Sequence, residues 1–183
     1  FKAANQAGVS TFMTGFNELN GIPVTGSEYL LRDLLKNKWG FQGFVISDWA
    51  SIEEMVTHGY ARDKADAANK AVKAGVDMDM ESSSFVDELI GLIQTGAVRE
   101  ELIDDAVRRI LKVKFLLGLF DDPYKYCDAE RELQTIGSEE NRKAVLDMAK
   151  KSIVLLKNEN NLLPLKKNGQ KIAVIGPLAD ASN

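Results

Sequence analysis

The sequence predicts an α/β protein built on parallel strands. Three short apolar runs alternate with stretches whose apolar residues recur at helical spacing. The run at 44–46 carries no charge and is aromatic or β-branched, which is typical of a strand buried on both faces of a parallel sheet. This alternation is typical of the last part of a (β/α)8 barrel or of half a doubly wound sheet. Because closing such a barrel takes about 250 residues, we expect its earlier strands to precede Phe1.

The first half of the chain predicts one strand–helix–strand unit. Gly8 closes a short helix, and a strand follows at 9–16. Gly, Asn and Pro then make 14–23 a turn-rich loop. Leucines recur at helical spacing over 27–38, and the strand at 44–46 completes a right-handed βαβ unit.

The next segment repeats the alternation. An alanine-rich helix is predicted over 63–74, where Gly75 ends it, and a short strand follows at 76–80. Helices are then predicted over 85–95 and 99–117, the second with an apolar stripe that covers a core.

Asp77 and Asp79 fall on one face of the strand predicted at 76–80. Two carboxylates suggest a hard metal ion, but a third oxygen ligand at a defined spacing is missing from the pattern. We therefore expect buried, hydrogen-bonded carboxylates and no metal or cofactor.

The pattern changes after residue 118. Residues 119–137 lack a sustained period and predict an extended linker between a first domain, 1–118, and a second, 138–183. A helix is predicted over 139–151 and another buried parallel strand over 171–177. The glycine turn that ends this strand lacks the repeated glycines and the Gly-Lys-Ser ending of a phosphate loop.

Composition excludes several functional classes. The formal net charge of −4 provides no basic surface for nucleic acid, and no apolar run is long enough to span a membrane. One cysteine, Cys127, and one histidine, His58, cannot assemble a zinc site from soft ligands. Because the chain does not start with methionine, we expect it to begin inside a longer protein, so it gives no information on targeting.

Asp48 is the first candidate for a catalytic group. It comes directly after the strand at 44–46, and the carboxyl ends of parallel strands are where α/β folds place their chemistry. Trp49 beside it would form a wall for a ligand. The alternative is that Ser47 or Asp48 caps a helix that begins at Ile52.

Several motifs in order carry a resemblance to a known family. They are GIP (21–23), WGFQGFVISDW (39–49), AGVDMDM (74–80), LGLFDDPY (117–124), SIVLLKN (152–158), LPL (163–165) and IAVIGP (172–177). Together they span almost the whole chain, and they resemble glycoside hydrolase family 3, with most similarity to its bacterial β-glucosidases. The resemblance implies the C-terminal part of a (β/α)8 TIM barrel, a linker and the beginning of an α/β sandwich domain.

The resemblance also implies a chemistry. Asp48 corresponds to the family's nucleophile in a retaining mechanism, in which a second, protonated carboxyl roughly 5 Å away assists the leaving oxygen. Trp49 corresponds to the platform beside the nucleophile, while Met13 and Phe16 correspond to residues that line the sugar pocket. For Met13 and Phe16 the alternative is core packing, and Phe16 lacks the hydroxyl of the tyrosine that is frequent at its position.

The resemblance implies that the acid/base is a glutamate beyond Asn183, although four glutamates follow strand ends here: Glu18, Glu53, Glu54 and Glu81. The expected substrate is a β-glucoside or oligosaccharide, and the location periplasmic or secreted. The alternatives are a β-xylosidase or β-N-acetylglucosaminidase, a non-catalytic sugar-binding or scaffold protein, and a nucleotide-binding module. Oligomeric state stays open, and we expect the 183-residue chain alone to be inactive and poorly folded because its strands have open edges.

Overall fold

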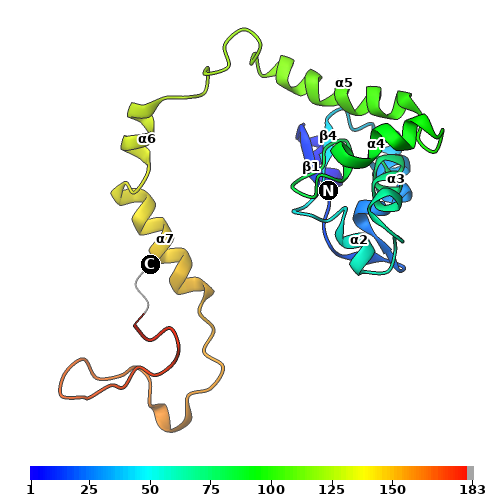
Figure 1. Cartoon of the computed structure of the whole chain (residues 1–183). Coiled ribbons are helices and arrows are strands. Elements are labelled where there is room, and N and C mark those ends of the chain that lie inside the picture. The colour runs from blue at the N-terminus through cyan, green and yellow to red at the C-terminus, as the bar shows by residue number, and fades with distance from the viewer. Residues whose placement is uncertain (181–183) are drawn as a thin grey trace. The chain divides into compact units, whose positions relative to one another are not determined.

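The computed structural model describes residues 1–180. The chain divides into two compact units, Phe1–Tyr126 and Cys127–Asn183 (Figure 1). The division between them falls inside the segment 119–137. The last three residues of the predicted region 138–183 lie outside the described residues.

The first unit is organised by two parallel strands. Strand β1 pairs with β4 in the register Thr11↔Phe44, Phe12↔Val45 and Met13↔Ile46. The helical connection between them is a π-helix, η2, in the region where a helix was predicted. The elements up to β4 are α1 (Lys2–Gln6), β1 (Thr11–Met13), β2 (Glu18–Leu19), β3 (Ile22–Pro23), η1 (Val24–Gly26), η2 (Tyr29–Lys38) and β4 (Phe44–Ile46).

The loop predicted at 14–23 contains a small antiparallel hairpin of β2 and β3, which the prediction missed. Asn20 and Gly21 form its two-residue turn, and both have positive φ, at 55° and 76°. A turn with two positive φ values matches the twist of a hairpin, and Asn-Gly is the dipeptide that adopts it most readily. The sequence therefore carried this signal.

The strand predicted at 76–80 is reduced to one parallel bridge, Ile46↔Met78. The reason is a side chain in the ladder: Asp77 Oδ2 accepts the N–H of Val45 at 2.8 Å, where a neighbouring strand would offer a carbonyl. The N–H groups of Asp77 and Met78 both donate to Val45 O, at 2.8 and 3.1 Å. Three parallel segments thus lie in the order β1, β4, Met78.

Helices cover these strands in the first unit. As predicted, α3 ends at Gly75, which has a φ of 110°; the carboxylate of Asp63 caps its start. Arg109 of α5 donates to the carbonyls of Phe41 and Gly43, which fixes α5 beside the start of β4. The helices after β4 are α2 (Glu54–Thr57), α3 (Lys64–Ala74), α4 (Ser84–Gln94) and α5 (Glu100–Leu116).

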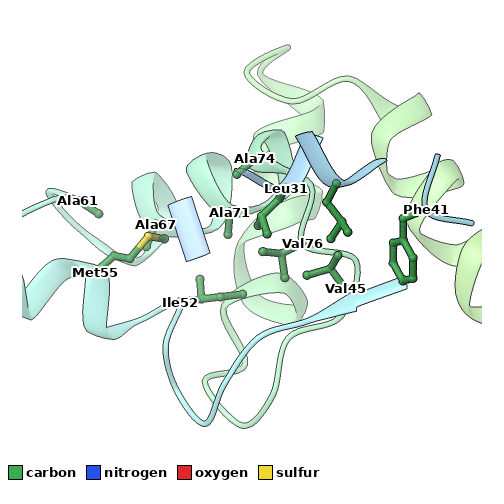
Figure 2. Close-up of a cluster of buried hydrophobic side chains, with 11 residues drawn as sticks. Leu31, Phe41, Val45, Ile52, Met55, Ala61, Ala67, Ala71, Ala74 and Val76 are labelled. Atoms are coloured by element: carbon green, nitrogen blue, oxygen red, sulfur yellow. The ribbon is translucent and has the colours of Figure 1, made fainter. Parts of the chain in front are cut away.

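The core of the first unit lies between β4 and the helices η2 and α3 (Figure 2). Small alanines on α3 allow its backbone to approach the sheet closely, and Val45 and Val76 are almost completely buried against it. The cluster consists of Leu31, Leu35, Phe41, Val45, Ile52, Met55, Ala61, Ala67, Ala71, Ala74 and Val76.

A buried ion pair crosses this core. Lys36 Nζ on η2 lies 2.6 Å from Asp77 Oδ1, and the two side chains are 2% and 3% exposed. Burial is the largest influence on both groups, because it penalises each charge: it lowers the pKa of Lys36 and raises the pKa of Asp77, against the opposing effect of each partner. The pair ties η2 to the segment beside β4.

The second unit contains the helices α6 (Ala129–Thr135), α7 (Glu139–Ser152) and η3 (Glu159–Asn161). Helix α7 confirms the helix predicted over 139–151, and the Ser138 side chain caps it. Two predictions were wrong: α6 lies inside the segment expected to be extended, where Asp128 caps it, and 171–177 is not a buried strand. Ile175 in that run is 90% exposed, because among the described residues of this unit no neighbouring strand or covering layer is present.

The described residues therefore show an α/β arrangement with parallel pairing in the first unit. Within residues 1–180, no helix combines the length and apolar character needed to cross a membrane.

Candidate active site

The carboxyl ends of β1 and β4 lie side by side. Met13 at the end of β1 is in register with Ile46 at the end of β4, and the N–H of Thr14 donates to Ile46 O at 2.9 Å. On the other side of β4, Ser47 N–H donates to Met78 O at 2.9 Å. Asp48 comes directly after Ser47, so it lies at the edge where three parallel segments end.

Asp48 is half-buried and held in one orientation. Its Oδ1 accepts the N–H of Trp49 at 2.7 Å, whereas within residues 1–180 its Oδ2 has no hydrogen-bond partner. The capping alternative for this loop was wrong. Helix α2 has no side-chain cap, and the Ser47 hydroxyl is buried and accepts Met80 N–H at 2.7 Å instead.

The loop that carries Asp48 is pinned to the segment after Met78. Ala50 N–H donates to Met80 O at 2.9 Å, and Ala50 adopts a positive φ of 54°. Glu81 and Ser83 in the facing loop also have positive φ, at 76° and 55°. A positive φ is energetically unfavourable for a non-glycine residue, and such residues are frequent in functional loops. The two facing loops are therefore a candidate functional site.

Asp79 orders the facing loop. One of its oxygens accepts from the Ser82 hydroxyl at 2.7 Å, and the other accepts Phe85 N–H at the start of α4 at 3.1 Å. Ser82 Oγ accepts the N–H of Ser84 at 3.4 Å, so a carboxylate and a hydroxyl together hold the start of α4. Asp77 and Asp79 are both hydrogen-bonded, as predicted, but only Asp77 is buried, whereas Asp79 is half-buried. Among the described residues, no three acidic, His or Cys side chains gather as a metal site would require.

A cluster of three buried hydroxyls lies at the backbone of Asp48. The hydroxyl cluster consists of Thr14 after β1, Thr25 in η1 and Ser51 before α2, each at most 4% exposed. The oxygens of Thr14 and Thr25 are 2.9 Å apart, and Thr25 donates to Ser51 at 3.0 Å. Thr14 Oγ1 accepts the N–H of Asp48 at 3.3 Å, and Ser51 N–H donates to Asp48 O at 3.1 Å. Sequence reasoning missed these residues because lone hydroxyls in loops give no periodic signal.

The three predicted sugar-contacting side chains are exposed. Trp49 is 62% exposed, Met13 51% and Phe16 40%. Within the described residues, Met13 and Phe16 are not packed in a core. Met13 is the last residue of β1, Trp49 lies in the loop three residues after β4, and Phe16 lies in the loop between β1 and β2.

Two protein-family models match this chain. The model of the glycosyl hydrolase family 3 N terminal domain matches residues 1–113, and that of the family 3 C-terminal domain matches residues 153–183. The chain belongs to glycosyl hydrolase family 3. The family resemblance seen in the sequence is thereby confirmed.

Within family 3 the chain is similar to enzymes with two named activities. It is 44% identical to a periplasmic β-glucosidase of Salmonella typhimurium over 99% of this chain and 24% of that protein. It is 39% identical to a β-xylosidase of Formosa agariphila over 97% of this chain and 25% of that protein. The β-glucosidase of Listeria innocua, solved with glucose, superposes with a TM-score of 0.74 at 42% identity, covering 90% of this chain and 22% of that one. The chain spans about a quarter of the length of these relatives.

Proposed function

We propose that this chain is part of a retaining glycoside hydrolase that releases terminal, non-reducing β-D-glucosyl residues, with Asp48 as its nucleophile. The observation that carries the proposal is the position of Asp48: a half-buried carboxylate at adjoining parallel strand ends, oriented through one oxygen and open at the other. The similarity to β-glucosidases supports the substrate class.

In this mechanism Asp48 Oδ2 attacks the anomeric carbon and forms a bond to it while the bond from that carbon to the leaving oxygen breaks. A protonated carboxyl from outside this chain gives its proton to the leaving oxygen. Water then attacks the same carbon, the same carboxyl takes the water's proton, and the Asp48 carboxylate is released with β configuration retained. Trp49 would pack against the sugar's C–H face, and Met13 and Phe16 would line the pocket.

The finer architecture belongs to the same proposal. Residues 1–118 would form the last part of a (β/α)8 barrel, 119–137 a linker and 138–183 the start of an α/β sandwich domain. The parallel order β1, β4, Met78 and the two family matches support this. A periplasmic or secreted location is proposed from the periplasmic relative.

The test is to trap the intermediate in the complete enzyme. A 2-deoxy-2-fluoro-β-glucoside with an activated leaving group slows hydrolysis of the intermediate, so the label should be recovered on the peptide that contains Asp48. Asp48→Ala should lower kcat by on the order of 10⁴-fold or more. Azide should restore turnover of that variant and yield the α-glucosyl azide, because azide would attack from the emptied side.

Glu53→Gln is the matched control, because it removes an exposed carboxyl five residues away and should leave kcat unchanged. A label on any residue other than Asp48, or an Asp48→Ala variant with the original rate, would refute the assignment.

A β-xylosidase is the second candidate, since a β-xylosidase is 39% identical across almost the whole chain. The ratio of kcat/KM for aryl β-glucoside and aryl β-xyloside decides between the two, because it measures differential binding of the transition state. A ratio that favours the xyloside would replace the glucosidase proposal.

A further inference from the structure

The hydroxyl cluster clamps the peptide groups on both sides of the Asp48 Cα. Thr14 Oγ1 accepts the Asp48 N–H, and the Ser51 N–H donates to the Asp48 carbonyl. Thr25 connects Thr14 and Ser51 through their hydroxyls, so the cluster links the end of β1, η1 and the loop before α2. Two members thus hold Asp48, and the third fixes the distance between them.

Each hydroxyl has one proton, which fixes the direction of the bonds. Thr25 donates its one hydroxyl proton to Ser51, so in the 2.9 Å hydrogen bond between Thr25 and Thr14 the donor must be Thr14. Thr14 therefore presents only lone pairs to the Asp48 amide. The Ser51 proton can close the ring to Thr14, whose oxygen lies 3.5 Å away. In this arrangement the Thr14 hydroxyl oxygen can only accept the hydrogen bond from the Asp48 N–H.

Stability alone is a poor reason for this arrangement. Burying three hydroxyls removes them from water, and their bonds to one another only offset that loss, whereas apolar residues of the same shape can replace a bonded set with little change in stability. Within the described residues, the cluster's hydroxyl oxygens make one bond outside the cluster, to the amide of Asp48.

We infer that Thr14, Thr25 and Ser51 are positioning residues that hold the Asp48 carboxylate at the attacking distance from the sugar. This inference rests on the proposed function. The loop they restrain includes Ala50 at positive φ, a conformation that persists only when its surroundings determine it. Because a misplacement of about 1 Å can cost about 100-fold in rate, a loosened loop would lower turnover while leaving the sugar-binding surface in place.

The experiment compares Thr14→Val, which keeps the shape and removes the acceptor, with Thr14→Ser, which keeps the hydroxyl. Turnover of an aryl β-glucoside by the complete enzyme is divided by the number of sites titrated with the 2-fluoroglucoside, so that loss of folded protein does not lower the measured rate. We expect kcat per site to fall about 10- to 100-fold in Thr14→Val, with KM changed less than about threefold. Thr14→Ser should recover kcat to within about threefold.

A per-site kcat of Thr14→Val within about threefold of wild type would overturn the inference, and so would an equal loss in Thr14→Ser. If Thr14→Val does not fold, Thr25→Val and Ser51→Ala decide: a per-site loss of more than about threefold supports the inference, and a smaller one overturns it. Failure of the proposed function is distinguishable, because wild type itself would then not be labelled at Asp48.

Discussion

Replacing Asp77 by Asn should lower the free energy of unfolding by about 3–5 kcal/mol, because it leaves the ammonium of Lys36 buried without a counter-charge. The loss also includes the hydrogen bond that Lys36 Nζ donates to Asp77 Oδ1, because an asparagine that keeps the bond from Val45 turns its NH2 group towards Lys36. The amide oxygen of the introduced asparagine can still accept the N–H of Val45, which Asp77 accepts at 2.8 Å, and the volume of the side chain is nearly unchanged.

The partner change Lys36→Met should cost a similar amount, since it leaves a carboxylate that is 3% exposed with one backbone N–H. The double variant removes both charges and fills the same space. We expect it to lie within about 1 kcal/mol of wild type, because an apolar or neutral pair avoids the desolvation of both ions. The double-mutant cycle should therefore give a coupling energy of about 5 kcal/mol or more.

Urea unfolding of the complete protein measures these free energies, and hydrogen exchange of the peptide over Phe44–Ile46 reports the loss locally. Asp147→Asn is the matched control: its ion pair with Lys151 has a similar length, 2.7 Å, but its side chains are 59% and 70% exposed, so the change should be below about 0.5 kcal/mol. An Asp77→Asn variant as stable as wild type, or a double variant as unstable as the sum of the singles, would refute the reasoning.

The same pair sets a pH dependence. Burial raises the pKa of Asp77 above its ordinary 3.8, so its contribution to stability is full below pH 3.8 and is lost as pH rises through the raised pKa. Burial lowers the pKa of Lys36 below 10.5, so its contribution is full above pH 10.5 and is lost as pH falls through the lowered pKa. The stability of the double variant relative to wild type should thus peak between these two transitions.

Two further changes test the strand start and the exposed indole. Gly43→Ala should lower the free energy of unfolding by about 3 kcal/mol or more, because the added Cβ would overlap the carbonyl of Ser10 in the backbone before β1. Gly91→Ala in α4 is the control: its Cβ meets no neighbouring atom, so the free energy of unfolding should rise by about 0.5–1 kcal/mol. Urea unfolding measures both changes. A Gly43→Ala variant as stable as wild type would show that the strands can separate at no cost. Trp49→Ala should lower kcat/KM for an aryl glucoside about 2- to 10-fold through lost stacking, and Trp49→Phe should keep most of it. Because Trp49 is 62% exposed, the thermal unfolding temperature of both Trp49 variants should be nearly that of wild type. Equal kcat/KM for wild type, Trp49→Ala and Trp49→Phe would show that Trp49 does not contact the sugar.

Helix α3 and strand β4 could be predicted because their signals are local. The alanine spacing and the closing Gly75 define α3, and the uncharged run before Ser47 defines β4. The run at 171–177 shows the limit of this reasoning. Its composition is that of a buried strand, but strand formation needs partner strands, and the described residues of the second unit supply none.

The position of Asp48 after a buried strand could also be predicted, but its surroundings could not. The alternative was that Ser47 or Asp48 caps the next helix. The Ser47 hydroxyl instead accepts the N–H of Met80, which lies 33 residues away in the sequence and so could not be identified from it. Likewise, the hydroxyl cluster joins residues 11 to 37 positions apart, and no periodicity links them.

The sequence by itself determined the family, the alternation of β1, η2, β4 and α3 in the first unit, and the carboxylate that follows β4, because these follow from local patterns and ordered motifs. Tertiary structure alone decided that Asp77 interrupts the third strand, that Met13 and Phe16 are exposed, and which groups hold the peptide of Asp48. The physical reason is that a buried polar group must find its partner wherever the fold brings one, and that partner is set by distance in space.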